Sequence, residues 1–323
     1  MQVTLRNSPF WTVHPVYSAR IHIHDVTIRA PLYAPNTDGI DPDSSQHVLI
    51  ERCDISVGDD YVAIKSGMGA VARDNFPRFV SENITVRNNV LRAGMGISVG
   101  SETSGGIRHV LVHHNTILGE GWCVALHVKS AAQRGGVVEH IEFRDNTVRN
   151  TTALMRIATF GRSAKPEGYP PTTLRHLSWI NNSYAMPDGQ QRRVRSKFLC
   201  PLGASCEHVV VINNSLGPSA TWQCERVMFA QVQNNTPPGS ESCLVGWRRA
   251  QPSGARLHDG PERSSRRERR ERRERRERRE RSKHGSQPPS LAKDRRGKPR
   301  RVMSRRFDWR TGRASWKVHA EEL

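Results

Sequence analysis

A short strand-like pattern recurs along the first two thirds of the chain. In each copy apolar residues alternate with polar ones and a small or amide residue follows, as in Ile84-Thr-Val-Arg-Asn-Asn89 and Ile141-Glu-Phe-Arg-Asp-Asn146. The copies end at residues 26, 53, 89, 115, 146, 182 and 214, so that neighbouring copies are 26 to 36 residues apart. Alternation with a period of two indicates short strands with one buried face.

This repeat predicts an all-β fold, a right-handed parallel β-helix in which the strands of successive coils stack. Its variable interval excludes helical repeats of fixed length, and no amphipathic helices separate the copies as a β-α-β sheet would require. The recurring asparagine fits the same fold, because stacked side-chain amides can hydrogen-bond along the axis. A β-sandwich in which the similarities are accidental is the alternative.

The positive charge of the chain is concentrated at its C-terminal end. The formal net charge is +19 over 323 residues, but residues 248–323 contribute +16 and residues 1–247 only +3. We therefore expect two parts, a β-helix over residues 1–247 and a basic low-complexity tail over residues 248–323. The near neutrality of the first part gives no electrostatic reason to assign it to nucleic acid.

The tail is dominated by a reiterated Arg-Arg-Glu triplet between Arg266 and Arg281. It lacks an apolar stripe and cannot bury a core, so we expect it to be disordered or a solvated single helix supported by Glu–Arg pairs. Binding to RNA, to an anionic polysaccharide or to an acidic protein is one interpretation of this charge. A charged appendage without a dedicated anionic partner is the other.

Cysteines and glycosylation sequons favour a secreted protein. Cys53 and Cys123 lie in apolar strand-like runs, as buried thiols do, whereas the closely spaced cysteines at 200 and 206 and at 224 and 243 could form two disulfides. Sequons begin at Asn83, Asn150, Asn181, Asn213 and Asn234. No spanning segment and no signal peptide are visible, so we expect no membrane association and an N-terminal part that is missing.

Three aspartates are candidates for acid–base chemistry. Asp38 lies in a loop rich in proline and asparagine, and Asp59 and Asp60 follow Gly58 at the end of a strand-like run. Asp38 and Asp60 are 22 residues apart, about one coil of the predicted solenoid, so their carboxylates should lie roughly 5 Å apart. Like charges this close raise one pKa and supply an acid near neutral pH. Gly58 would permit the bend that turns both neighbouring aspartates outward.

A cationic pair stands farther along the chain. His127 and Lys129 alternate with apolar neighbours, which predicts that both side chains face away from the core. If the coils stack in register, they lie on the surface that carries the aspartates. A lysine beside carboxylates suits the hydrolysis of an acidic polysaccharide, because it can pair with a uronate. Considered alone, Lys129 would be an ordinary solvated charge.

Together these residues resemble glycoside hydrolase family 28, the polygalacturonase family. The resemblance is strongest over residues 3 to 150 and weakens towards Trp222-Gln-Cys224 and Cys243. The motifs that carry it are Asn7-Ser-Pro-Phe-Trp-Thr-Val-His-Pro15, Ala34-Pro-Asn-Thr-Asp-Gly-Ile-Asp-Pro42, Val57-Gly-Asp-Asp60, Ala63-Ile-Lys-Ser-Gly67, Gly94-Met-Gly-Ile-Ser-Val-Gly-Ser-Glu-Thr-Ser-Gly-Gly106, His127-Val-Lys-Ser130 and Arg134-Gly-Gly136.

The resemblance implies a secreted or cell-wall enzyme, expected to be monomeric, that hydrolyses α-1,4-galacturonosidic bonds of pectin with inversion and without a metal or other cofactor. On this reading Asp59 is the general acid, Asp38 and Asp60 activate the attacking water, and Lys129 binds the substrate carboxylate. Inversion requires room for that water, and therefore an acid-to-base separation of about 6.5–9.5 Å.

Two positions depart from the family pattern, and both belong to the predicted substrate-binding set. Met95 stands where the family usually has the histidine of Gly-His-Gly, and His127 stands where it has the arginine of Arg-x-Lys. The second change replaces a permanent, fork-shaped cation by a titratable one. We also expect that the first coils and the N-terminal cap of the family are missing from this chain.

Three functions other than pectin hydrolysis are also compatible with the sequence. The first is an inactive β-helix that binds polysaccharide, which the changes at Met95 and His127 favour and the three aspartates oppose. The second is a nucleic-acid or scaffold function of the basic segment Arg263–Arg306. The third is a calcium-dependent pectate lyase, which would need metal-binding carboxylates and a catalytic arginine.

Overall fold

The structure is a computed structural model. It describes residues 3–75, 77–119, 123–131, 134–160, 170–185, 194–201, 206–217, 220–236, 243, 302–308 and 313–319. The chain divides into two units, Met1–Ser253 and Gly254–Leu323. The boundary predicted after residue 247 lies outside the described residues, as does the Arg-Arg-Glu segment.

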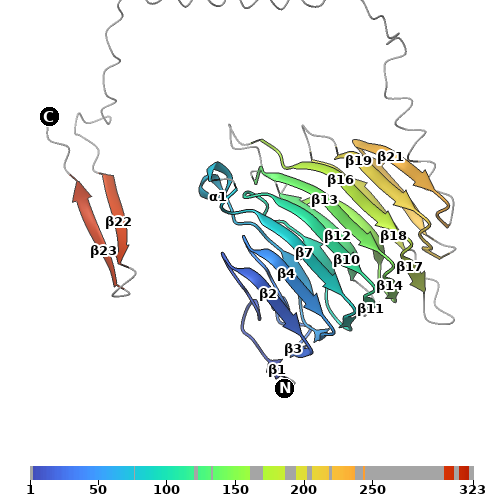
Figure 1. Cartoon of the computed structure of the whole chain (residues 1–323), viewed down its shortest axis with the longest axis horizontal. Helices are drawn as coiled ribbons and strands as arrows, with labels where there is room; N and C mark the ends of the chain where they lie inside the picture. Colours follow the sequence, from blue (N-terminus) through green and yellow to red (C-terminus); the bar gives the residue numbers. More distant parts are fainter. Residues whose placement is uncertain are drawn as a thin grey trace, which may run out of the picture. The chain divides into compact units, whose positions relative to one another are not determined.

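The first unit is a parallel β-helix, as predicted (Figure 1). Its coils stack three parallel sheets, and only one short helix, α1 (Ala70–Asp74), is described. The seven-stranded sheet holds β1 (Val3–Arg6), β3 (Val26–Arg29), β5 (Asp54–Ser56), β8 (Val90–Leu91), β11 (Thr116–Leu118), β14 (Thr147–Arg149) and β17 (Ser183–Ala185).

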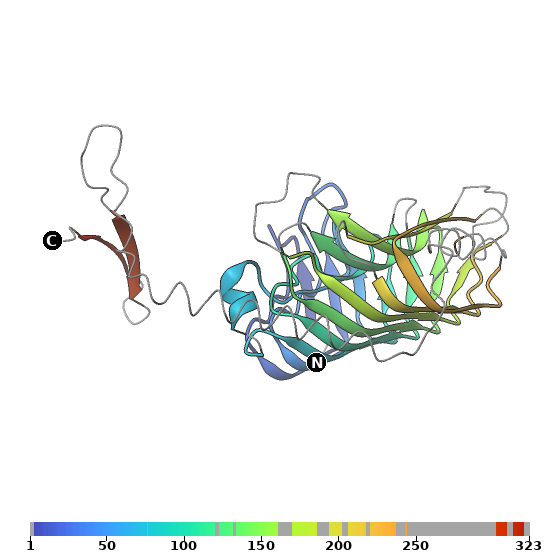
Figure 2. The same ribbon diagram turned by 90° about the horizontal axis from the view of Figure 1, so that it is seen from above.

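The other two sheets follow the same order of coils, and Figure 2 shows the sheets side by side along the solenoid. The eight-stranded sheet holds β2 (Ala19–His24), β4 (Gln46–Glu51), β7 (Ser81–Arg87), β10 (Ile107–His113), β13 (Val137–Arg144), β16 (Thr173–Ile180), β19 (Cys206–Ile212) and β21 (Val227–Gln233). The six-stranded sheet holds β6 (Val62–Ile64), β9 (Ile97–Val99), β12 (Val124–Ala131), β15 (Ala153–Phe160), β18 (Arg195–Leu199) and β20 (Thr221–Glu225).

The core consists of inward-facing side chains that stack from one coil to the next. In the seven-stranded sheet Ile28 pairs with Ile55 and Ile55 with Leu91, and all three are fully buried. The aromatic residues Phe143 and Trp179 stack in the interior with ring centroids 5.4 Å apart. Polar residues alternate with these apolar ones along each strand, so one face of every sheet is left to the outside.

The predicted asparagine ladder is present and fully buried. From Asn115 onward, each side-chain oxygen accepts hydrogen bonds from the backbone and the amide of the asparagine one coil earlier, as Asn146 does from Asn115 at 3.0 Å for both, whereas the Asn89 oxygen accepts from the N–H of Cys53. The ladder runs through Asn89, Asn115, Asn146, Asn182, Asn214 and Asn235. It satisfies the buried backbone where the chain turns from the eight-stranded to the seven-stranded sheet.

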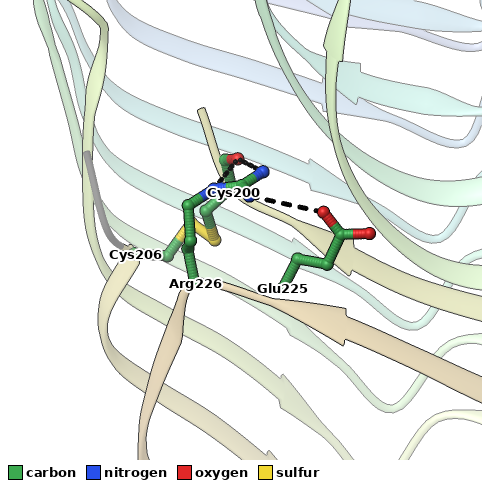
Figure 3. The surroundings of a disulfide bond; sticks show 4 residues. All are labelled: Cys200, Cys206, Glu225 and Arg226. Atoms are coloured by element: carbon green, nitrogen blue, oxygen red, sulfur yellow. Dashed lines mark hydrogen bonds and ion pairs between the residues drawn. A yellow bond between two sulfur atoms is a disulfide. The ribbon is translucent and has the colours of Figure 1, made fainter. Parts of the chain in front are cut away.

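The cysteines pair in the way that their spacing allowed. Disulfides join Cys200 to Cys206 and Cys224 to Cys243, whereas Cys53 and Cys123 are buried free thiols. Figure 3 shows the first disulfide beside Arg226, whose guanidinium donates to the carbonyl oxygen of Cys200 at 2.7 Å. The last coils are thus fastened covalently.

The second unit contains a feature that the sequence analysis did not expect. Strands β22 (Val302–Asp308) and β23 (Arg313–His319) pair as an antiparallel hairpin. The second segment, Arg313–His319, alternates polar residues with apolar or aromatic ones, which is a strand pattern, but the arginine-rich composition of the tail obscured it. Nowhere in the described residues is a helix both long and apolar enough to span a membrane.

Candidate active site

The three predicted acids meet on the outer face of the six-stranded sheet. Asp38 lies two residues before Ile40, which bridges Val62 of β6, and Asp60 is separated from the start of β6 by Tyr61 alone. The Gly39 N–H donates to the carbonyl oxygen of Asp60 at 2.9 Å, so the two loops lie side by side. One oxygen from each carboxyl group lies within 4.8 Å of the others. The stacking expected from the 22-residue spacing is therefore present.

Close backbone approach explains two glycines of the site. A Cβ at Gly58 would lie 2.2 Å from the carbonyl oxygen of Ala34, so only glycine lets the loop before Asp59 pass this close to the Asp38 loop. Gly96 has a φ of +135°, and a Cβ there would lie 1.8 Å from the carbonyl oxygen of Val124. Both positions exclude any side chain.

Asp60 is held by two donors. The Ser98 hydroxyl donates to Oδ1 at 2.8 Å, and the Lys129 ammonium pairs with Oδ2. Asp60 is buried, so this ion pair and hydrogen bond offset the cost of removing its carboxylate from water. Lys129, predicted to bind substrate, thus lies at the site and contacts one of the three acids directly.

Lys65 is a second cation under the cluster, and the sequence analysis did not identify it. Its ammonium is 3.6 Å from Asp38, 3.8 Å from Asp41 and 3.5 Å from Glu102. It also lies 4.2 Å from the ring centroid of Trp11, within cation–π range. Lys65 is nearly fully buried, so these groups fix its position from several sides.

The surroundings push two of the three acids towards the protonated form. Burial, followed by the charge of Asp60, raises the pKa of Asp38 to about 7, against the opposing pull of Lys65. Burial and Asp60 also raise the pKa of Asp59. Burial raises the pKa of neighbouring Asp41 well above its usual range as well. The cluster can therefore keep a proton near neutral pH.

Replacing Asp38 by asparagine is expected to stabilise the folded protein at alkaline pH. Folding raises the pKa of Asp38 from 3.8 to about 7, so between these pH values the folded state holds a proton that the unfolded state has lost. Asp38 therefore lowers the free energy of unfolding as the pH rises from about 4 to 7. Removing this buried charge should raise the free energy of unfolding by on the order of 2–4 kcal/mol at pH 8 and change it little at pH 4. Guanidinium unfolding of both proteins at both pH values measures this difference. A stabilisation that is the same at pH 4 and pH 8 would contradict the raised pKa of Asp38.

His127 is far less accessible to solvent than the sequence predicted. His127 faces away from the core, as expected, but only 3% of it is exposed. Burial, then Lys129 and Arg156, lowers its pKa well below the usual range, so it is a neutral side chain. Register places Arg156 beside His127 on the next coil and Lys197 beside Arg156 on the coil after. Permanent cations thus continue the column that His127 occupies.

Met95 lies at the edge of the cluster. Its N–H donates to the carbonyl oxygen of Asp59 at 2.9 Å, and its side chain is partly exposed. The backbone between Gly94 and Gly96 therefore supports the loop of the predicted acid. The thioether itself can neither donate nor take up a proton at this place.

The residues that the sequence analysis missed at this site are Lys65, Ser98 and Arg156. Each had a signal, since each lies at an outward position of a strand whose neighbours are apolar: Ala63-Ile-Lys65, Ile97-Ser-Val99 and Met155-Arg-Ile157. The pattern shows that such a side chain faces outward, but only the contacts between coils show that Lys65 and Ser98 meet the aspartates and that Arg156 lies beside His127.

Three carboxylates at this spacing are also a donor set that a hard divalent cation could use. Two of them, Asp38 and Asp60, already lie beside the ammonium groups of Lys65 and Lys129. A cation would have to compete with these two positive charges. Three oxygen donors are also fewer than the six to eight that calcium usually takes.

Comparison with known proteins identifies the family. The family model for glycosyl hydrolases family 28 matches residues 1–236. A probable polygalacturonase from Vitis vinifera is 38% identical over 187 residues, which are 55% of this chain and 36% of that protein. An endo-polygalacturonase from Pectobacterium parmentieri is 35% identical over 230 residues, 70% of this chain and 51% of its own length.

Two solved structures share the fold. An exopolygalacturonase from Thermotoga maritima aligns with a TM-score of 0.56 and 28% identity, over 70% of this chain and 51% of its own. The polygalacturonase from Erwinia carotovora aligns with a TM-score of 0.58 and 26% identity, over 70% and 55%. This chain spans about half or less of the relatives it matches. With more than half of its residues matched by the family model, the chain belongs to glycosyl hydrolases family 28.

Proposed function

We propose that this protein hydrolyses the α-1,4-galacturonosidic bonds of polygalacturonate and pectin. The observation that carries the proposal is the set of three aspartate oxygens within 4.8 Å of one another. They lie on an outward face that also presents lysine and arginine. A polymer of uronates needs both acids for bond cleavage and cations for its carboxylates. The names of the relatives, polygalacturonases of plants and bacteria, agree with this choice of substrate.

Asp59 is the proposed general acid. It is the most accessible of the three acids and the one whose loop the Met95 backbone supports. Its pKa is raised by burial and by Asp60, which favours the protonated form that a general acid needs. Its proton passes to the glycosidic oxygen, which leaves with the bond electrons as the hydroxyl of the departing sugar.

Asp60 and Asp38 are the proposed bases that take a proton from the attacking water. Lys129 and Ser98 hold Asp60 in position. Asp38, with a pKa of about 7, becomes a better base as pH rises through neutrality. Water activated by these carboxylates attacks the anomeric carbon from the face opposite the leaving group.

The stereochemistry of this attack is a sharp test of the assigned roles. Inverting glycosidases keep acid and base carboxyl groups about 6.5–9.5 Å apart, and retaining ones about 5–5.5 Å apart. The oxygens of this cluster lie within 4.8 Å, on the shorter side of that division. The anomer of the first product therefore decides whether Asp38 and Asp60 act as bases on water, as proposed, or one of them attacks the sugar directly.

The substrate chain is proposed to run along the column of cations on the six-stranded sheet. Lys129 binds the uronate at the cleavage point, and Arg156 and Lys197 lie on the next two coils in the column of His127, two residues along the strand from the register position of Lys129. Neutral, buried His127 supports this surface by packing rather than by charge. Because strands repeat about every 4.8 Å, the cations are spaced closely enough for successive sugars.

The test is release of reducing ends from polygalacturonic acid, followed by proton NMR of the first product. We expect hydrolysis that EDTA does not change and a β-anomer that appears before mutarotation. An α-anomer would contradict inversion while leaving the hydrolase assignment intact. Loss of activity in EDTA, with an unsaturated product absorbing near 235 nm, would instead establish a metal-dependent lyase.

A polysaccharide-binding protein without turnover is the second candidate. The observation that favours it is that Lys129 already pairs with Asp60, an arrangement that substrate must disturb. Affinity electrophoresis in polygalacturonate gels distinguishes the two, because a binder is retarded without releasing reducing ends. The disulfides agree with secretion, and deleting residues 248–323 tests whether any RNA binding belongs to the tail.

A further inference from the structure

A ladder of histidines runs along the outside of the eight-stranded sheet, away from the aspartates. The rings of His109, His140, His176 and His208 stack on four consecutive strands, β10, β13, β16 and β19. Their centroids are 5.0, 4.7 and 4.6 Å apart, and neighbouring planes differ by 8°, 3° and 17°. We call these four residues the histidine ladder.

The backbone holds the ladder in place. All four histidines have a φ of +53° to +55°, and the flanking residues pair in register on both sides. The same bulge position is taken by His47 and Asn83 on the two preceding strands, also with positive φ. The spacing of the rings is therefore set by the stacking of the coils and not by the histidines themselves.

The ring nitrogens of the ladder are open to a ligand. Three of the four side chains are exposed and His176 is half-buried. Among the described residues none of the four rings makes a hydrogen bond or an ion pair. Burial and the neighbouring histidines lower the pKa of His176, which favours the neutral ring that a metal requires.

The charges beside the ladder are balanced. Arg108 pairs with Glu82 at 2.8 Å, and Arg175 pairs with Glu139 at 2.7 Å. These four side chains immediately precede the bulge on neighbouring strands. A divalent cation approaching the rings therefore meets ion pairs and not an unpaired positive group.

We propose that neighbouring rings of the histidine ladder bind divalent transition-metal ions of the copper and zinc class, each ion held by two rings, so that the four rings hold two ions. Imidazole is the preferred protein ligand of these ions, and copper binds such sites most strongly. Metal–nitrogen bonds of about 2.0–2.1 Å require the two nitrogens to approach to about 4 Å or less. Exposed rings can tilt towards each other by that amount, and water completes the coordination.

Two double variants with the same number of histidines test the pairing. His140→Asn with His208→Asn removes every adjacent pair but leaves two isolated rings, whereas His109→Asn with His140→Asn leaves the pair of His176 and His208. Asparagine is chosen because Asn83 already occupies this bulge position at a φ of +56°. Histidines elsewhere in the protein contribute equally to both variants.

Titration of Cu²⁺ into each protein, followed by calorimetry and electron paramagnetic resonance, gives the result. We expect two ladder ions in the parent and one in the variant that keeps the pair of His176 and His208. In the variant with two isolated rings, Cu²⁺ should bind about a hundredfold more weakly, because no second imidazole is held beside the first at high effective concentration. Equal affinity and stoichiometry in the two double variants would overturn the proposal.

A second measurement needs no variant. Diethyl pyrocarbonate modifies free imidazole nitrogens, and peptide mass spectrometry locates the modified histidines. We expect Cu²⁺ to protect the four ladder histidines while His47, whose counterparts at the bulge position of the neighbouring strands are Arg20 and Asn83, remains reactive. Ladder histidines that react as fast with Cu²⁺ as without it would rule the sites out even if both variants failed to fold.

Discussion

Replacing Asp59 by asparagine is expected to lower kcat on polygalacturonate by about 10²–10⁴-fold, the usual contribution of a positioned general acid. Asparagine has the same shape and keeps an oxygen that can accept the 2.9 Å hydrogen bond from the Asp60 N–H. It has no proton to give to the leaving oxygen. The measurement is the initial rate of reducing-end release, with substrate binding followed separately.

The matched control is Asp54→Asn. Asp54 lies on β5 of the seven-stranded sheet and pairs with Arg29 and Arg92, outside the aspartate cluster. Its replacement should change kcat by no more than about twofold, because it affects no group that contacts substrate. If Asp59→Asn lost as little activity as Asp54→Asn, the acid would have to be another group, and Asp38, with its raised pKa, would be the first to examine.

Replacing Asn146 by alanine is expected to cost about 2–5 kcal/mol of unfolding free energy, since each buried group left without a partner costs about 1–3 kcal/mol. Its side-chain oxygen accepts from the backbone and the amide of Asn115. Its amide donates to Val112 and to Asn182. All of these bonds are buried in the middle of the ladder, where water cannot replace them. Chemical denaturation followed by circular dichroism measures the loss.

Asn181→Gly is the control for the ladder. Asn181 is the exposed neighbour of Asn182 and has a φ of +54°, which glycine adopts without strain. Removing its side chain should lower the free energy of unfolding by less than about 1 kcal/mol. Equal losses in the two variants would show that the buried amide contacts add nothing beyond a surface hydrogen bond.

The sequence predicts the solenoid well because one physical rule generates it. Every coil needs short strands with one apolar face, and every coil repeats the same turn, so the alternation and the recurring asparagine appear again and again. The pairing of Cys200 with Cys206 follows equally from short spacing. Asp38 and Asp60 could be placed together because their separation is close to one coil.

Other features could not be derived in this way. Lys65, Arg156 and the histidine ladder consist of residues far apart in the chain, and the length of each loop decides whether two outward side chains coincide. Likewise, outward alternation gave no indication that His127 would be nearly fully buried, because the neighbouring coils cover it. The hairpin of β22 and β23 was hidden by the composition of its surroundings.

The amino-acid sequence by itself determined the coil, its buried face and the clustering of the candidate acids Asp38 and Asp60, since these depend on local alternation and on the spacing of motifs. The tertiary structure alone decided which cations face those acids, which histidines stack and which polar groups are dehydrated. These properties arise from register between coils and from burial by distant residues. Register fixes distances of a few ångströms between side chains, and both the pKa of Asp38 and the spacing of the ladder depend on them.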